Sequence, residues 1–246
     1  MTTKILKSLF IFAVLSFLFS CSTMEKDSST AEGLYKIAQE YDTAERYEVA
    51  LQKYGDVKNK FPYSSLAISS ELAIADVNFK RESYAEAQIA YQNFRDLHPK
   101  HPKIDYVIYR TGMSFFQQLP DSIDRDLSLA TDAIYHFGEV IKNYPKSEFV
   151  SDSKEKRDKC YIMLAEKELY IANFYLQQKQ FEASLVRFEN LLVKYPGLGL
   201  DPKALLGATR AAAKLNNERK QKKYSELLSM KYSNSDEAKI LKTEGL

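Results

Sequence analysis

The segment YEVALQKYGDVKNKFP, Tyr47 to Pro62, decides the fold, because three other segments of the chain align with it without gaps. These are YAEAQIAYQNFRDLHP (Tyr84 to Pro99), ATDAIYHFGEVIKNYP (Ala130 to Pro145) and FEASLVRFENLLVKYP (Phe181 to Pro196). Each segment ends in a proline 15 positions after its first residue. Self-similarity of this kind is typical of a repeat architecture.

Three positions give the shared pattern its physical meaning. A small residue stands three positions in, an aromatic residue seven and a further apolar residue ten, offsets that lie on one face of an α-helix. The small residue allows a neighbouring helix to approach closely, and the aromatic ring fills the groove beside it. We therefore expect helix-to-helix packing at Ala50, Tyr54, Ala87, Tyr91, Ala133, Phe137 and Phe188. The closing proline cannot continue the helix and predicts a turn.

Each of these helices is preceded by another apolar pattern at helical spacing. Examples are Leu34, Ile37, Ala38 and Tyr41 before the first segment, and Ile171, Ala172 and Tyr175 before the fourth. The pairs resemble the two helices of a tetratricopeptide repeat, although the tryptophan often found early in that motif is absent. The resemblance predicts an all-α fold, a tetratricopeptide-repeat superhelical solenoid of about five helix pairs.

The spacing of the closing prolines locates the insertions. Pro62, Pro99, Pro145 and Pro196 are 37, 46 and 51 residues apart, compared with about 34 in the usual repeat. We expect a loop from Gln118 to Ser128 after a helix over about 104 to 117, and one extended helix from Asp152 to Tyr175. Residues 203 to 232 predict a degenerate fifth pair that closes on Tyr232-Ser233.

Residues 1 to 20 have the features of a signal peptide. Lys4 and Lys7 precede an apolar run of 11 residues, Leu9 to Phe19, which is too short to span about 30 Å of hydrocarbon. Leu18-Phe19-Ser20-Cys21 then resembles the lipobox of bacterial lipoproteins, with Phe19 as a departure from it. An ordinary signal peptide cut near Ser20 is the alternative.

The lipobox implies that Cys21 carries the covalent lipid and anchors the protein to a membrane, with palmitate among its acyl chains. Ser22, in place of the aspartate that retains such lipoproteins in the inner membrane, favours the outer membrane. Residues 21 to 30 are expected to form a lipidated, flexible tether. The body is then divided into repeats 1 to 3 over residues 31 to 147 and repeats 4 and 5 over residues 148 to 246.

Charge and cysteine content restrict the partners. Loss of Lys4 and Lys7 with the leader leaves 33 basic residues against 33 acidic ones, so the body is neutral and a nucleic-acid partner is not expected. With Cys21 acylated, Cys160 has no partner for an intramolecular disulfide, and its apolar helical surroundings predict a core residue.

The sequence offers little for catalysis, so neither an enzyme nor a cofactor is expected. His98 and His101 are interpreted as exposed turn residues, and His136 as a residue on a helix surface. Gly197 and Gly199 follow a helix-terminating proline and are interpreted as turn residues, not as a phosphate loop.

Binding of other proteins is the usual role of an array of this kind. Side chains on the first helix of each pair are the candidate peptide contacts, namely Tyr35, Gln39, Asp42, Leu72, Asp76 and Phe79. Their mixed aromatic and acidic character suits an extended peptide with aromatic and basic groups. For Tyr35, Leu72 and Phe79, packing between repeats is the alternative interpretation.

Two runs carry a more specific resemblance. Asp124-Arg125-Asp126 is followed by Ala133, Phe137, Tyr144-Pro145-Lys146-Ser147 and Asp152, and a later helix contains Leu164-Ala165, Glu168, Ala172 and Phe174-Tyr175. Over residues 21 to 237 the chain resembles the BamD family, lipoproteins of the outer-membrane β-barrel assembly machinery. Asp124, Arg125, Asp126, Glu168 and Tyr175 are the family-motif residues. The turn after the second repeat, His98-Pro99-Lys100-His101, departs from the family's Tyr-Pro-x-Ser, as does Leu198 after the fourth.

This resemblance implies a non-enzymatic scaffold at the periplasmic face of the outer membrane. Its expected partners are the periplasmic domains of BamA, bound by the C-terminal repeats, unfolded outer-membrane proteins, received by the N-terminal ones, and other Bam lipoproteins. The alternative is another repeat lipoprotein, such as a pilus-secretin assembly factor. The insertion around Asp124 argues against that alternative, because those proteins have more uniform repeats.

Overall fold

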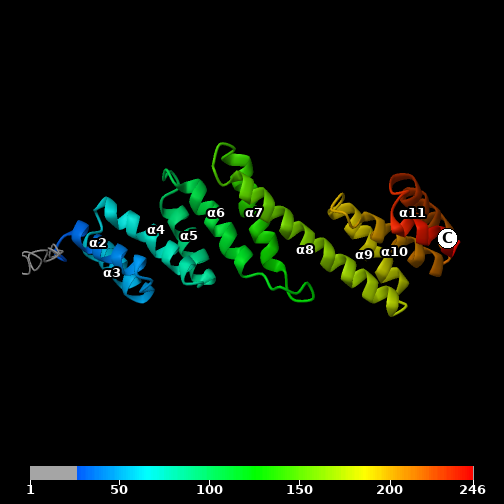
Figure 1. The fold of residues 1–246 in the computed structure, drawn as a ribbon, viewed down its shortest axis with the longest axis horizontal. Helices are drawn as coiled ribbons and strands as arrows, with labels where there is room; N and C mark the ends of the chain where they lie inside the picture. Colours follow the sequence, from blue (N-terminus) through cyan, green and yellow to red (C-terminus); the bar gives the residue numbers. More distant parts are fainter. Residues whose placement is uncertain (1–26, 246) are drawn as a thin grey trace, which may run out of the picture. The chain divides into compact units, whose positions relative to one another are not determined.

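The computed structural model describes residues 27–245, which form eleven α-helices and no strand (Figure 1). The all-α prediction is therefore confirmed. The predicted signal peptide and the lipid acceptor Cys21 lie outside the described residues. Within residues 27–245, no helix combines the length and apolar character needed to cross a bilayer.

The described chain consists of two compact units. The first ends at Val77 and the second begins at Asn78, so the boundary falls inside α4 (Ser65–Lys80). The division after residue 147 predicted above falls between two helices of the second unit. The assignment of different partners to the repeats before and after residue 147 stays a prediction.

The first unit contains α2 (Ala31–Thr43), α3 (Tyr47–Lys60) and most of α4. The Thr30 hydroxyl begins α2 by accepting a hydrogen bond from the Gly33 N–H, at 3.1 Å. Its core joins the small residues of α2 and α3 to the ring of Tyr54 and to Val77. The small residues leave space at the helix interface, and the ring of Tyr54 fills it, as the repeat pattern predicts.

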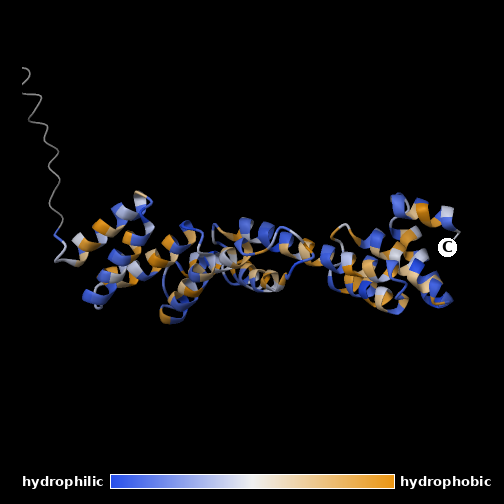
Figure 2. Ribbon diagram, turned by 90° about the horizontal axis from the view of Figure 1, so that it is seen from below, coloured by the Kyte–Doolittle hydropathy of each residue, from blue (hydrophilic) through white to orange (hydrophobic). Residues whose placement is uncertain are grey.

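The second unit continues with eight helices whose bounds follow the repeat pattern. They are α5 (Tyr84–Leu97), α6 (Ile104–Gln117), α7 (Ser128–Asn143), α8 (Val150–Gln177), α9 (Phe181–Lys194), α10 (Asp201–Lys214), α11 (Glu218–Lys231) and α12 (Asp236–Glu244). From α5 to α11 each helix packs against the next one in the chain. Figure 2 shows hydrophobic and hydrophilic residues mixed along each helix, as expected when one face of each is buried.

Helix α8 is the long helix that the sequence predicted, and it has 28 residues. Its first half packs through Cys160 into a core with α6 and α7. Its second half packs through Ala172 into a different core with α9, α10 and α11. One uninterrupted helix therefore belongs to both cores of the second unit.

Four of the turns within helix pairs share a left-handed residue two positions before the second helix. The residues are Glu45, Glu82, Lys179 and Asn216, with φ between 53° and 63°. At each turn the following N–H donates to the carbonyl five residues back, for example Arg46 to Tyr41 at 2.8 Å. This is the Schellman ending, here built without glycine.

The turns between pairs are equally uniform. The residue that ends each second helix has φ near −130°, at Phe61, His98, Tyr144, Tyr195 and Tyr232. In the Pro-x-Ser turn before α8 the serine hydroxyl stabilises the turn itself, since Ser147 accepts a hydrogen bond from the Phe149 N–H at 3.3 Å. Tyr232-Ser233 makes the same turn without proline, which confirms the degenerate fifth pair.

The predicted loop of the third repeat is confirmed over residues 118–127. Helix α12 was not predicted. It begins where the Ser235 hydroxyl accepts from the Ala238 N–H, and it ends at Gly245 in the left-handed conformation. It packs against α10 and α11, with Ala238 and Leu241 in the core.

The recurrent packing contact is one between an aromatic ring on one helix and a small residue on a neighbouring helix. The seven expected packing residues Ala50, Tyr54, Ala87, Tyr91, Ala133, Phe137 and Phe188 are all 2% exposed or less. Phe137 of α7 faces Gly112 of α6, and Phe188 of α9 faces Gly207 of α10. A Cβ atom added at Gly207 would lie 2.1 Å from the Phe188 ring.

His136 is a correction to the sequence analysis, which placed it on a helix surface. It is buried, and its ring stacks on Phe115 of α6 with centroids 5.5 Å apart. Burial lowers the pKa of His136 to about 4, with a further contribution from the charge of Arg95. Cys160 is buried as predicted, and burial raises the pKa of its thiol to about 12.

We expect Gly207→Ala to lower the free energy of unfolding by about 1 to 3 kcal/mol, because the new methyl group overpacks the Phe188 site. Gly138→Ala in α7 is the matched control, since nothing lies within 4 Å of the added Cβ. It should stabilise the protein by roughly 0.5 to 1 kcal/mol through helix propensity. Chemical denaturation measures both, and equal effects would contradict the packing described.

Candidate protein-binding site

An aromatic and acidic cluster lies in the first unit, where contact residues were expected. The rings of Tyr35 and Tyr54 meet edge to face with centroids 5.4 Å apart. Burial raises the pKa of Tyr35, and the nearby carboxylates of Asp76 and Asp42 raise it further. Gln39 is exposed on the same helix, α2. The first unit therefore brings two tyrosines and two carboxylates close together.

Two expected contact residues are positioned differently. Leu72 is buried, which agrees with the packing alternative for that residue. Phe79 belongs to the second unit, where the guanidinium of Arg110 lies 3.6 Å from its ring centroid. That cation–π contact covers one face of the ring.

The family-motif loop of the third repeat is held at two points. Asp126 accepts from the N–H and the hydroxyl of Ser128, at 3.0 and 2.8 Å, where α7 begins. The Arg125 carbonyl accepts a hydrogen bond from the Lys167 ammonium of α8, and Asp124 accepts one from the Ser122 hydroxyl. The side chains of Asp124 and Arg125 remain exposed.

Of the two motif residues of α8, Glu168 has a structural partner on α9. Both carboxylate oxygens of Glu168 accept from Nη1 of Arg187, at 3.2 and 3.3 Å. Tyr175 is half-buried, with its ring centroid 5.7 Å from that of Phe174. Glu168 therefore joins α8 to α9, and Tyr175 lies beside an exposed phenylalanine.

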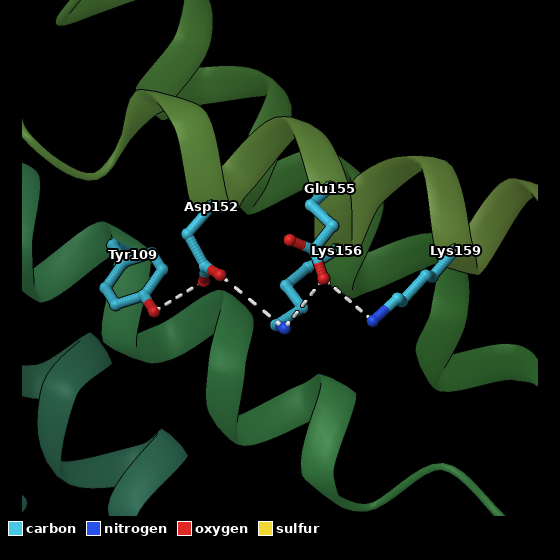
Figure 3. A network of polar contacts seen from close by, with 5 residues as sticks. All are labelled: Tyr109, Asp152, Glu155, Lys156 and Lys159. Atoms are coloured by element: carbon cyan, nitrogen blue, oxygen red, sulfur yellow. Dashed lines mark hydrogen bonds and ion pairs between the residues drawn. The ribbon is translucent and has the colours of Figure 1, made fainter.

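A polar network fixes the beginning of α8 (Figure 3). The Tyr109 hydroxyl of α6 donates to Asp152 at 2.7 Å, and its ring stacks on Phe149 at 4.7 Å. Lys156 lies 3.5 Å from Asp152 and 3.4 Å from Glu155. Burial and this hydrogen bond raise the pKa of Tyr109. The network explains why an aspartate follows the Tyr-Pro-x-Ser turn at position 152.

Helix α8 also presents apolar side chains to solvent, which the sequence analysis did not identify. Ile162, Tyr170 and Phe174 are 39, 51 and 49% exposed. Their spacing of eight and four residues keeps them on one side of the helix. The sequence predicted one extended helix here, and the structure shows which of its apolar side chains face outward.

The remaining candidates for chemistry are packing residues. The rings of His98 and His101 lie against Phe94, with centroids 4.8 and 5.0 Å away, so both are half-buried and not fully exposed as expected. Among residues 27–245, no group of three His, Cys, Asp or Glu side chains is placed to hold a metal ion. Gly197 and Gly199 have positive φ and form the turn after α9.

Repeated helix pairs, joined by uniform turns and packed ring against small residue, define a tetratricopeptide-type repeat protein. A family model described as "YfiO: Outer membrane lipoprotein" matches residues 27–228. The chain belongs to this family.

Relatives in other bacteria agree with this assignment. A protein of Neisseria meningitidis serogroup A named "Outer membrane protein assembly factor BamD" is 28% identical over 206 residues, which cover 78% of this chain and 77% of the relative. A Pasteurella multocida protein of the same name is 26% identical over 222 residues, covering 86% and 85%.

Solved structures are more distant. The TPR2AB domain in the pHSP90 complex of yeast Sti1 gives a TM-score of 0.48 at 12% identity, covering 85% of this chain and 80% of that one. PilW, described as a type IV pilus biogenesis factor, gives 0.38 at 13% identity, covering 86% and 97%. Similarity at this level does not distinguish one function from another.

Tyr109→Phe should lower the free energy of unfolding by roughly 1 to 2 kcal/mol, because it removes the hydrogen bond to Asp152 and retains the ring. Tyr135→Phe is the matched control, because Tyr135 is 63% exposed. Removing its hydroxyl should change the free energy of unfolding by less than about 0.5 kcal/mol. Urea denaturation compares the two, and equal stability of both variants would show that the hydroxyl does not support α8.

Proposed function

We propose that this protein is a lipid-anchored scaffold of outer-membrane β-barrel assembly, which holds other proteins and catalyses no reaction. The observation that carries the proposal is the similarity over most of the chain to relatives named outer membrane protein assembly factor BamD. The helical array supports it, because stacked pairs provide long surfaces for protein contacts.

Cys21 is the proposed attachment point. Acyl chains on this cysteine would hold the protein at the outer membrane, facing the periplasm. The family description, an outer membrane lipoprotein, supports this location.

Repeats 4 and 5, residues 148 to 246, are the proposed docking site for the periplasmic domains of BamA. The exposed row of Ile162, Tyr170 and Phe174 supports this assignment, because aromatic anchors contribute strongly to protein interfaces. The hydrogen bond between Glu168 and Arg187 joins this helix to α9. Other Bam lipoproteins are proposed as further partners.

Unfolded outer-membrane proteins are the proposed ligands of the N-terminal repeats, residues 31 to 147. The cluster of Tyr35, Asp42 and Asp76, with Gln39 beside it, suits an extended segment that carries aromatic side chains and backbone donors. Asp42 and Asp76 would accept its N–H groups, and the tyrosine would contact its rings.

The alternative, a pilus-secretin assembly lipoprotein, is less well supported. The loop over residues 118–127 and the long α8 make the third and fourth repeats unequal to the others. The names of the relatives also favour barrel assembly.

The test measures binding of BamA periplasmic domains to the full chain in detergent. Tyr170→Ala combined with Phe174→Ala should weaken binding by more than about tenfold, since both exposed rings are removed. Tyr135→Ala on α7 is the matched control and should bind normally. If the double variant binds as tightly as the unaltered protein, α8 is not the docking surface. If the unaltered protein does not bind BamA, the proposed function is wrong.

A further inference from the structure

Residues of α9, α10 and α11 line a groove of about 480 Å³ that the docking surface proposed on α8 does not include. This volume is large enough for side chains of a bound segment. Leu192, Val193 and Leu227 provide its apolar lining, and Lys223 and Lys231 lie at its edge.

The apolar lining is open to solvent. Val193 is 79% exposed, although it follows the half-buried Leu192 on the same helix. Leu227 of α11 is half-buried on the opposite side. An apolar side chain from another molecule could therefore pack between α9 and α11 and remove this surface from water.

Two carboxylates of the groove already have partners. Asp201 is 6% exposed, and its Oδ2 accepts from the Gly197 N–H at 2.8 Å and from the Tyr232 hydroxyl at 3.1 Å. Glu189 accepts from the Tyr224 hydroxyl and lies 2.7 Å from the Lys220 ammonium. Both groups hold the fifth helix pair against α9.

The charge of Lys223 acts on the Glu189 carboxylate, but no ion pair joins the edge lysines to either carboxylate of the groove. Lys223 and Lys231 are exposed, and neither makes an ion pair with any residue in 27–245. Lys223 lies 5.1 Å from the centroid of the Tyr224 ring, which keeps it beside the groove. Residues 201 to 245 carry ten Lys and Arg against six Asp and Glu, so the positive charge extends beyond the groove itself.

We propose that this groove binds an acidic peptide segment of a partner protein, with an apolar side chain between Leu192 and Leu227 and carboxylates beside Lys223 and Lys231. The positive charge of the two lysines favours an acidic segment, and the apolar lining favours a segment that also carries apolar side chains. A membrane surface is a poorer fit, because Leu192 and Leu227 are half-buried between helices and are less accessible to a flat headgroup layer than to a single side chain. The inference rests on the proposed function in one respect, namely that the C-terminal helices serve to dock protein partners.

The experiment titrates a fluorescein-labelled peptide of alternating glutamate and leucine into the full chain in detergent and follows fluorescence anisotropy. Lys223→Glu combined with Lys231→Glu should weaken binding by about tenfold or more, and the Lys→Gln pair should weaken it less. Lys203→Glu combined with Lys214→Glu on α10 makes the same charge change outside the groove and should not affect binding. Val193→Ser should weaken binding, whereas Val186→Ser, also exposed on α9, should not.

Circular dichroism establishes that each variant is folded. The inference is overturned if the peptide does not bind, if a peptide with lysine in place of glutamate binds equally well, or if the groove variants bind normally. Binding of anionic lipid vesicles without binding of the peptide would also overturn it and assign the lysines to a membrane. BamA binding is measured separately, so loss of peptide binding with BamA binding retained would leave the proposed function intact.

Discussion

The contact between an aromatic ring and a small residue on the neighbouring helix is the constraint on which the structure depends. Phe188 packs on Gly207 at a distance that leaves no room for a methyl group, and Phe137 packs on Gly112, where an added Cβ would lie 3.0 Å from the ring. A helix pair cannot bury its apolar face alone, so each ring must be covered by a neighbouring helix. The long helix α8 is covered by neighbouring helices along both halves, because it packs into two cores of the second unit.

The turns keep this contact in register. A left-handed residue precedes the second helix by two positions in four pairs, and a single turn geometry ends each second helix. The packing ring therefore always faces inward, and side chains outside this pattern are left exposed. Tyr170, Phe174 and Val193 are of this kind, which is why the proposed binding surfaces consist of residues that the repeat pattern does not use.

The sequence predicted the elements that follow from periodicity and proline spacing, among them the loop over 118–127, the long α8 and the fifth pair. It did not predict α12, whose nine residues are too few for a clear period. The Schellman turns were not predicted either, because glutamate, lysine and asparagine replace the expected glycine. The burial of His136 depends on Phe115 of another helix. The groove beside Val193 combines three helices, and no single segment of sequence encodes it.

Together, the packing rule and the exposed residues support a carrier of protein-binding surfaces, for which we propose a lipid anchor at Cys21. Affinity purification of the lipoprotein from detergent-solubilised outer membranes, followed by mass spectrometry, tests this account most directly. It predicts that BamA co-purifies and that Cys21 carries acyl chains. Recovery of the protein with pilus-assembly proteins and without BamA, or with an unmodified Cys21 released from membranes, would contradict it.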